Sequence, residues 1–252
     1  MDFEGKVALV TGASRQIGAA VAVALGQRGA AVVVNYFSGK ERAERVAAQV
    51  EAAGGRALVH GADVRDRGAV REMVERAADT LGGLDFLINN ARHMHPKKPF
   101  LELDWEQDMW PQMEVHLGGA FHCCQEAIPH MLNRGGGVIV NMLSMSFRSP
   151  SPQTHAYGPA KAALRNFTMN LAVEQGPLGI RVNSVTPGHT ASPEYPSRRP
   201  KAELENIRQN VALRRIGAPE EVAEAVVFLC SDAARHIAGA DLPVTGGSTI
   251  TL

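Results

Sequence analysis

Tyr157 and Lys161 have the residue types and the spacing for proton transfer. They lie four residues apart, so on a helix both side chains point to one face. A free phenol has a pKa of about 10, and a neighbouring ammonium lowers that pKa by stabilising the phenolate. Tyr157 could then give a proton to a carbonyl oxygen or take one from an alcohol. Proton transfer of this kind needs a reaction partner, and the remaining motifs indicate which one.

A glycine-rich loop near the start of the chain is typical of phosphate binding. The stretch TGASRQIG, residues 11–18, follows an apolar run and leads into a helical pattern. In such a unit Gly12 allows a tight turn and Gly18 allows close packing of helix on strand. The free N–H groups of the helix N-terminus then bind a diphosphate. Gln16 stands where a third glycine is expected, so the loop departs from the usual pattern.

Short apolar runs alternate with amphipathic stretches and predict the elements that position these residues. The runs are mostly rich in valine without polar alternation, as in strands covered on both faces: 7–10, 31–34, 57–60, 85–88, 137–140, 181–185 and 241–244. Helical patterns, with start signals at Asp66 and Pro219, cover 17–25, 40–53, 66–81, 112–133, 156–175 and 219–230. The alternation predicts a single α/β domain over residues 1–252, a Rossmann-like, doubly wound parallel β-sheet of about seven strands with helices on both faces.

One long irregular stretch, residues 187–206, holds four prolines and follows the sixth apolar run. Ligands in such sheets bind beyond the carboxyl ends of the strands. We therefore expect residues 187–212 to form a substrate lid within the domain. A surface excursion without a role is the alternative.

Composition limits the class of protein. Lys plus Arg and Asp plus Glu number 26 each, so no overall charge attracts nucleic acid or an anionic membrane. No run approaches the ~18 apolar residues of a membrane helix, and no secretory signal is visible. The three cysteines, Cys123, Cys124 and Cys230, lack CxxC spacing, which favours buried thiols over disulfides or zinc ligands. We expect a cytoplasmic protein.

The order and spacing of the motifs resemble those of the short-chain dehydrogenase/reductases. The resemblance runs from residue 5 to about 248 and rests on five motifs: the loop at 11–18, NNA at 89–91, Ser144, YGPAK at 157–161 and PG at 187–188. Five motifs in family register are much more specific than any single one. The segments VNYFSGKERAE and GADLPVTGG most resemble members similar to 3-oxoacyl-(acyl-carrier-protein) reductase.

The resemblance implies a hydride transfer between nicotinamide and a carbonyl or secondary alcohol, with 3-oxoacyl thioesters among the candidate substrates. Ser144 would hydrogen-bond the reacting oxygen, Tyr157 would act as acid or base, and Lys161 would also hold the nicotinamide ribose. Asp63 would bind the adenine amino group, and Asn89 would brace the strand and the adenine side. No metal is expected. The full set of expected cofactor contacts is Gly12, Ser14, Arg15, Ile17, Gly18, Tyr36, Asp63, Val64, Asn90, Tyr157, Lys161, Pro187 and Gly188.

The end of the second apolar run favours NADP(H) over NAD(H). NAD-using members usually carry an acidic residue there, whereas this chain has Asn35 and Tyr36. Arg15, in the neighbouring loop, suits a 2′-phosphate through a bidentate, charge-assisted contact. NAD(H) stays the alternative.

Several residues depart from the family pattern. Gln16 either crowds the cofactor or donates a hydrogen bond to a phosphate. Arg92 replaces the glycine after NNA and either narrows the nicotinamide pocket or meets an acidic substrate. His116 occupies the position of the family's fourth catalytic residue, an asparagine, and is either a proton relay or a packed core residue. His93 and His95 lack further metal ligands and are expected to line the substrate mouth.

Two functions therefore stay open at the level of sequence. The first is an NADP(H)-dependent enzyme with a small-molecule carbonyl or alcohol substrate, and the second is a non-catalytic dinucleotide-binding regulator or scaffold. Ser144, Tyr157 and Lys161 together favour the enzyme, because a non-catalytic protein has no chemical need for all three. The apolar helix and last strand within 220–247 predict a homotetramer, with a helix buried in its own subunit as the alternative.

Overall fold

A seven-stranded parallel sheet forms the centre of the molecule in the computed structural model, which describes residues 3–94, 97–149, 152, 154–191 and 200–248. The strand order is β3-β2-β1-β4-β5-β6-β7, so the order reverses between β1 and β4. The strands are β1 (Val7–Val10), β2 (Ala31–Tyr36), β3 (Arg56–Gly61), β4 (Phe86–Asn89), β5 (Gly137–Met142), β6 (Ile180–Pro187) and β7 (Asp241–Val244). Each of the seven apolar runs forms a strand, which confirms the predicted doubly wound sheet.

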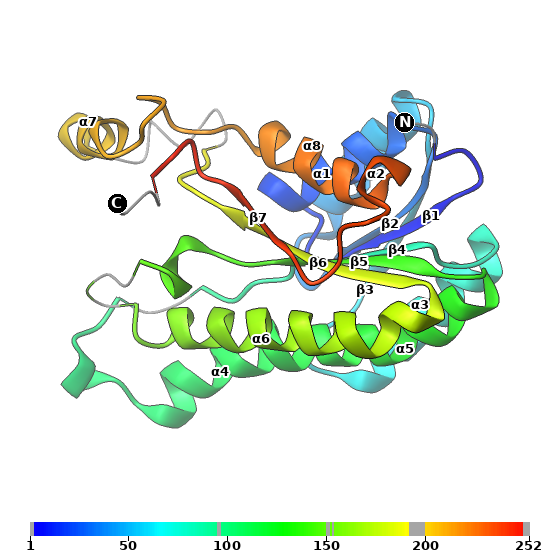
Figure 1. The fold of residues 1–252 in the computed structure, drawn as a ribbon, viewed down its shortest axis with the longest axis horizontal. Coiled ribbons are helices and arrows are strands. Elements are labelled where there is room, and N and C mark those ends of the chain that lie inside the picture. Colours follow the sequence, from blue (N-terminus) through cyan, green and yellow to red (C-terminus); the bar gives the residue numbers. More distant parts are fainter. Residues whose placement is uncertain (1–2, 95–96, 150–151, 153, 192–199, 249–252) are drawn as a thin grey trace.

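Helices cover both faces of the sheet (Figure 1). One face carries α1 (Gln16–Gly26), α2 (Lys40–Ala52) and α8 (Pro219–Cys230), and the other carries α3 (Arg67–Leu81), α5 (Gly119–Asn133) and α6 (Tyr157–Gln175). Side chains along β1 alternate between the two layers: Ala8 and Val10 pack with the first group, and Leu9 with the second. Burial on both faces explains why the strands are apolar without alternation.

The helix predicted over 112–133 is confirmed, but part of it is π-helical. It comprises α4 (Trp110–Met113), a π-helical turn (Glu114–Gly118) and α5, and a second π-helical turn (Trp105–Met109) precedes α4. The wider turns keep the helical hydrogen bonds while shifting the side-chain register, so apolar periodicity could not reveal them. Such turns are frequent at functional sites.

The prediction of an irregular stretch over 187–206 is wrong for its last residues, which are helical. Helix α7 (Lys201–Gln209) begins directly after Pro200, and Leu204 and Ile207, three residues apart, are its buried side chains. Pro200 presents a fixed backbone at the helix start, and the apolar pair gives the short helix one packed face. Residues 192–199 of the expected lid lie outside the described residues.

The cysteines are free and buried, as their spacing predicted. Burial raises the pKa of the Cys124 thiol to about 12, and likewise that of Cys230 to about 12, so both stay protonated at neutral pH. Among the described helices, none is at once long and apolar enough to cross a membrane.

Candidate active site

The three residues expected to carry the chemistry meet where β5 ends and α6 begins. Ser144 follows the last residue of β5 closely, and Tyr157 is the first residue of α6. The Ser144 side chain hydrogen-bonds the Tyr157 phenol. Gly158 permits the close approach, because a Cβ there would lie 2.9 Å from the carbonyl oxygen of Ser146. The predicted triad is thus assembled by packing the helix N-terminus against the loop after β5.

Lys161 lies one helical turn further along, beneath Tyr157. Its side chain is buried, and its Nζ donates a hydrogen bond of 2.7 Å to the carbonyl oxygen of Met142. The Nζ stands 5.7 Å from the centre of the Tyr157 ring. Both side chains therefore share one face of α6, as their spacing predicted.

Burial dominates the electrostatics of this pair in the protein alone. Burial raises the pKa of Tyr157, and the Ser144 hydrogen bond and the charge of Arg92 oppose that rise only in part. Burial also lowers the pKa of Lys161 to about 7, with Arg92 adding to the effect. Desolvation disfavours the charged form of each group, and it is the largest cause of both shifts.

The glycine-rich loop connects β1 to α1 beside this triad. A Cβ on Gly18 would lie 2.4 Å from Nδ2 of Asn90, which shows how tightly the loop packs. The Asn90 Nδ2 donates to the carbonyl oxygens of Thr11 and Gly12, at 2.8 and 3.1 Å. Gln16 adopts a φ of 51°, in the left-handed region that favours glycine, so it keeps the backbone shape of the residue it replaces.

Asn35, at the end of β2, connects the loop to the sheet. Its Oδ1 accepts a hydrogen bond of 3.0 Å from the Gly12 N–H, and its Nδ2 donates to the carbonyl oxygens of His60 and Ala62. The side chain is buried. The residue that replaces the usual carboxylate therefore has a structural task of its own.

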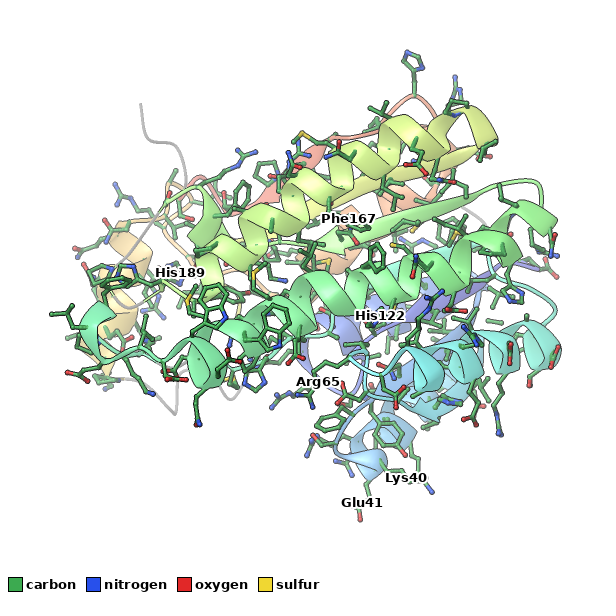
Figure 2. The ribbon with its side chains drawn as sticks, turned by 90° about the horizontal axis from the view of Figure 1, so that it is seen from below. Lys40, Glu41, Arg65, His122, Phe167 and His189 are labelled. Carbon is green, nitrogen blue, oxygen red and sulfur yellow. The ribbon has the colours of Figure 1, made fainter. Side chains whose placement is uncertain are left out.

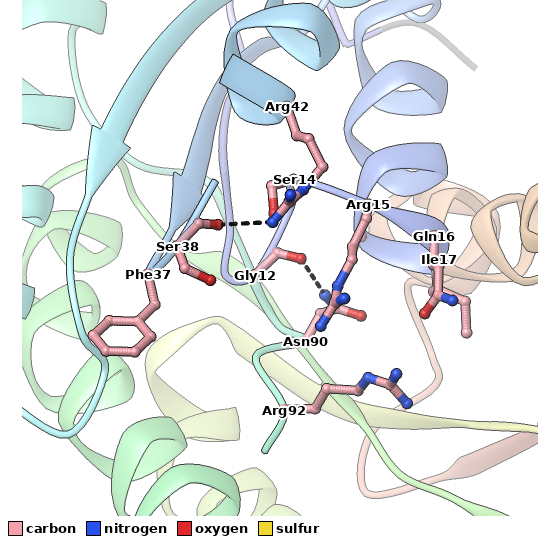
Figure 3. Close-up of a pocket in the computed structure, with 11 residues that line it drawn as sticks. Gly12, Ser14, Arg15, Gln16, Ile17, Phe37, Ser38, Arg42, Asn90 and Arg92 are labelled. Atoms are coloured by element: carbon pink, nitrogen blue, oxygen red, sulfur yellow. Dashed lines mark hydrogen bonds between the residues drawn. The ribbon is translucent and has the colours of Figure 1, made fainter. Parts of the chain in front are cut away.

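Three guanidinium groups line the pocket in front of the loop (Figure 3). Arg15 was expected there, whereas Arg42 and Arg92 come from α2 and from the segment after β4. Desolvation by burial lowers the pKa of Arg15, and the charges of Arg92 and Arg42 lower it further. The other lining residues are Gly12, Ser14, Gln16, Ile17, Gly18, Phe37, Ser38 and Asn90. Ser38 and Arg42 were not predicted as site residues. They follow the second strand in NYFSGKER, and a polar and a basic residue at the strand's carboxyl end are the signal that could have identified them.

A second pocket adjoins the first and contains Asp63 and Val64. Both oxygens of Asp63 accept hydrogen bonds from Arg65, whose guanidinium also lies 5.7 Å from the centre of the Phe37 ring. The Arg65 contact holds the pKa of Asp63 below its usual value. Phe37 and Arg65, neither of which was anticipated, therefore stand beside the residue expected to bind adenine.

Tyr36, Pro187 and Gly188 line neither of these two pockets. A Cβ on Gly61 would lie 2.9 Å from the Tyr36 hydroxyl oxygen, so that ring lies over β3. Pro187 is the last residue of β6, and the Gly188 N–H donates to the carbonyl oxygen of Val244. Their expected roles toward a cofactor stay predictions.

The comparisons with known proteins agree with this geometry. Residues 12–249 match a family model described as enoyl-(acyl carrier protein) reductase. The chain is 40% identical to cis-4-hydroxycyclohexanecarboxylate dehydrogenase of Sinomonas cyclohexanicum, with 98% of both chains covered. It is 34% identical to a 3-oxoacyl-(acyl-carrier-protein) reductase of Staphylococcus aureus, with 96% of this chain and 97% of the reductase covered. The chain belongs to the short-chain dehydrogenase/reductase family.

A solved member of the family has the same fold. The structure of a 7α-hydroxysteroid dehydrogenase complexed with NADH and 7-oxo glycochenodeoxycholic acid matches with a TM-score of 0.91 and 31% identity, covering 98% of this chain and 95% of that one. This short-chain dehydrogenase/reductase is therefore an oxidoreductase that binds a nicotinamide dinucleotide. The pocket fits such a polyanion, because it combines the N-terminus of α1 with three arginines, and none of its described lining residues is acidic.

The histidines that depart from the family pattern lie in different environments. His116 belongs to the second π-helical turn, and its ring meets the Tyr157 ring edge to face, with 5.1 Å between their centres. Its Nε2 lies 3.2 Å from Oε1 of Gln112, and it lines a small cavity together with Lys161. His93 is exposed and lines the second pocket, and His95 lies outside the described residues. No cluster of metal ligands occurs in the described part of the chain.

Proposed function

We propose that the protein is an NADP(H)-dependent oxidoreductase in which Tyr157 is the acid and base. The observation that supports this most directly is the meeting of Ser144, Tyr157 and Lys161 beside the glycine-rich loop. In the proposed reduction, the Tyr157 Oη gives its proton to the substrate's carbonyl oxygen, and the reverse transfer occurs in alcohol oxidation. The dinucleotide supplies or accepts the hydride.

Each neighbour has a separate role in this proposal. The Ser144 hydroxyl, which already contacts the phenol, holds the reacting oxygen in line with Tyr157. Lys161 places its nitrogen under the phenol ring, where a proton on Nζ favours the phenolate that forms during reduction. His116 packs against the same ring and is the candidate for carrying protons onward.

The preference for NADP(H) rests on Arg15 and Arg42. Both line the pocket at the carboxyl end of β2, where Ser38 adds a polar side chain, and the strand itself ends without a carboxylate. A 2′-phosphate carries the charge that two guanidinium groups can bind, whereas the 2′-hydroxyl of NAD(H) does not. The solved relative binds NADH, so this preference would be a property of this chain's own arginines.

The proposed substrate is a secondary alcohol or its ketone, with 3-oxoacyl thioesters as one class. The relatives named above act on a hydroxylated cyclohexanecarboxylate and on 3-oxoacyl-(acyl-carrier-protein), so the family site accepts both rings and chains. Residues 187–212 are the proposed lid, since α7 lies beyond the carboxyl ends of β6 and β7 (Figure 1).

We extend the proposal to a cytoplasmic homotetramer. The free, buried cysteines suit a reducing compartment. Assembly is supported by apolar side chains that α5 and α6 leave exposed, Phe121, Met169 and Val173 among them. Helix α8, by contrast, buries its apolar side chains in the core that it shares with α1.

Substituting Tyr157→Phe tests the proposed chemistry. We expect it to reduce turnover of ketones with NADPH by at least about 10²-fold, which is the rate enhancement that a positioned proton donor usually provides. The dissociation constant of NADPH should stay within about threefold of the wild-type value. Turnover is followed by NADPH absorbance and binding by fluorescence titration. Ser144→Ala should lower turnover less, because it leaves the phenol in place. Unchanged turnover in Tyr157→Phe would assign the acid to another group, and binding without any turnover in the wild type would favour the non-catalytic alternative.

A further inference from the structure

Arg92 stands across the pocket from the glycine-rich loop. It follows β4 and Ala91, and it lines the pocket together with Asn90, whereas Gln16 and Ile17 line the pocket from the start of α1. In the close-up, the Arg92 and Arg15 side chains both extend into the space in front of the loop (Figure 3). An anion bound to the loop would therefore face Arg92 on its other side.

The charge of Arg92 acts on groups at both ends of this space. It lowers the pKa of Arg15 on the loop side, and it lowers the pKa values of Tyr157 and Lys161 on the side of the triad. The guanidinium is thus within electrostatic range of both the loop and the triad.

No acidic side chain in the described part of the chain forms an ion pair with Arg92. Its polar contact is a weak one, from Nη2 to Sδ of Met94 at 3.6 Å, and the side chain is exposed. The positive charges of Arg92, Arg15 and Arg42 repel one another, and none of the described lining residues is a carboxylate. A bound anion would relieve this repulsion. An anion that enters the pocket would therefore meet a guanidinium that no described carboxylate neutralises.

We propose that Arg92 binds the diphosphate of the cofactor and closes the phosphate site opposite the loop. The inference rests on the proposed function, because it takes the pocket to be the dinucleotide site. The ligand is a diphosphate diester, which offers oxygens to a guanidinium on one side and to the loop N–H groups on the other. Gln16 replaces a glycine of the loop and adds a side chain to the phosphate site. In this proposal the Arg92 guanidinium binds the phosphates from the other side of the pocket.

This assignment separates two kinds of arginine in one pocket. NADPH and NADH share the diphosphate and differ in the 2′-phosphate, so Arg92 should serve both cofactors equally. Arg15 and Arg42 are the residues proposed above for the 2′-phosphate, and Arg42 also donates to the carbonyl oxygen of Ser38, so both should serve NADPH alone. The two cofactors therefore report separately on the two contacts.

The test is a fluorescence titration of NADPH and NADH against Arg92→Met, Arg92→Lys, Arg42→Ala and Arg45→Ala. Arg92→Met should weaken both cofactors by about tenfold or more, as expected when a charged hydrogen bond is lost, and Arg92→Lys should recover part of that loss. Arg42→Ala should weaken NADPH alone. Arg45, exposed on the same helix and outside the pocket, is the matched control and should change neither.

The outcomes that overturn the assignment are distinct. If Arg92→Met weakened NADPH alone, Arg92 would bind the 2′-phosphate. If it left both dissociation constants unchanged and raised KM for a carboxylated ketone but not for its methyl ester, Arg92 would bind substrate. If the wild type bound neither nucleotide, the cofactor site itself would be misplaced. Arg92 is exposed, so folding of the variants, checked by thermal melting, should match the wild type.

Discussion

At the scale of single residues, Lys161 is buried away from water, and its Nζ donates a hydrogen bond to the carbonyl oxygen of Met142. The side chain is 2% exposed, and burial lowers its pKa from 10.5 to about 7. The folded protein therefore releases this proton near pH 7, whereas the unfolded chain keeps it up to about pH 10.4. The unfolded state binds more protons within that window, so the stability contribution of Lys161 rises with pH across it.

Lys161→Met should remove this pH dependence. We expect the free energy of unfolding of the wild type, relative to the variant, to increase between pH 7 and about 9.5. Tyr157 does not interfere, because its raised pKa places its titration above this window. Urea unfolding at several pH values measures the difference, with the exposed Lys97→Met as the control. Parallel profiles for wild type and Lys161→Met would show that Lys161 keeps its proton when buried.

Site residues that belong to a motif of fixed spacing were predictable, and those whose place depends on the fold were not. Ser144, Tyr157 and Lys161 follow a fixed register, so the sequence placed them together correctly. Arg42 and Arg92 were not assigned to the phosphate site, because their place depends on which side chains of α2 and of the segment after β4 face the loop. The burial that raises the pKa of Tyr157 in the protein alone could not be read from the motif.

At the scale of elements, a buried polar chain joins two strands to α6. The Asn89 Nδ2 donates to Oδ1 of Asn141 at 2.8 Å, and the Asn141 Nδ2 donates to Oγ1 of Thr168 at 2.9 Å. The Thr168 hydroxyl in turn donates to the carbonyl oxygen of Leu164. Because Thr168 lies on the helix that carries Tyr157 and Lys161, this series of hydrogen bonds sets the position of α6 over β4 and β5.

Asn141→Ala should therefore destabilise the fold by about 2–4 kcal/mol, because Asn89 and Thr168 each lose a partner inside the core. Thr168→Ser, which keeps the hydroxyl, should cost about 1 kcal/mol through the lost methyl group. Urea unfolding measures both free energies. A decrease in the free energy of unfolding below about 1 kcal/mol for Asn141→Ala would mean that water replaces the missing amide. The hydrogen bonds of Asn141 would then not hold α6 in place.

The elements themselves were largely predictable from periodicity. The seven strands and the helices α2, α3, α6 and α8 follow apolar patterns, and Asp66 caps α3 as predicted, since its side chain accepts from the N–H groups of Gly68 and Ala69. The π-helical turns and α7 were not predictable. The π-helical turns keep an apolar face while changing register. Helix α7 begins directly after a proline, in a segment that otherwise favours loops.

At the scale of the whole molecule, the outer side of α5 and α6 is apolar and exposed. Phe121, Met169 and Val173 are 42%, 38% and 80% exposed. Figure 2 looks onto this layer, where α5 and α6 lie side by side, and the Phe121 ring lies 6.1 Å from that of the labelled Phe167. An apolar surface of this kind marks a contact with another molecule, and a second copy of the chain is the proposed one.

Val173→Glu should break this proposed contact. We expect light scattering to show a smaller assembly than the wild-type tetramer, because a carboxylate would be buried against apolar side chains. Leu101→Glu, at an exposed position outside α5 and α6, controls for added charge. A wild-type protein that is monomeric at micromolar concentration would remove the tetramer from the proposal. An unchanged mass for Val173→Glu would place the contact elsewhere.

The amide of Asn35 also limits how the enzyme could be re-engineered. A designer who wished to favour NADH over the proposed NADPH would first consider an acid at this position, at the end of β2. Aspartate would still accept from the Gly12 N–H, but it would set a second acceptor against the carbonyl oxygens of His60 and Ala62, where the amide now donates. Such a change would disturb the loop that either cofactor needs. Phe37 and Ser38, which line the same pocket, are the positions where cofactor choice can be altered without dismantling the site.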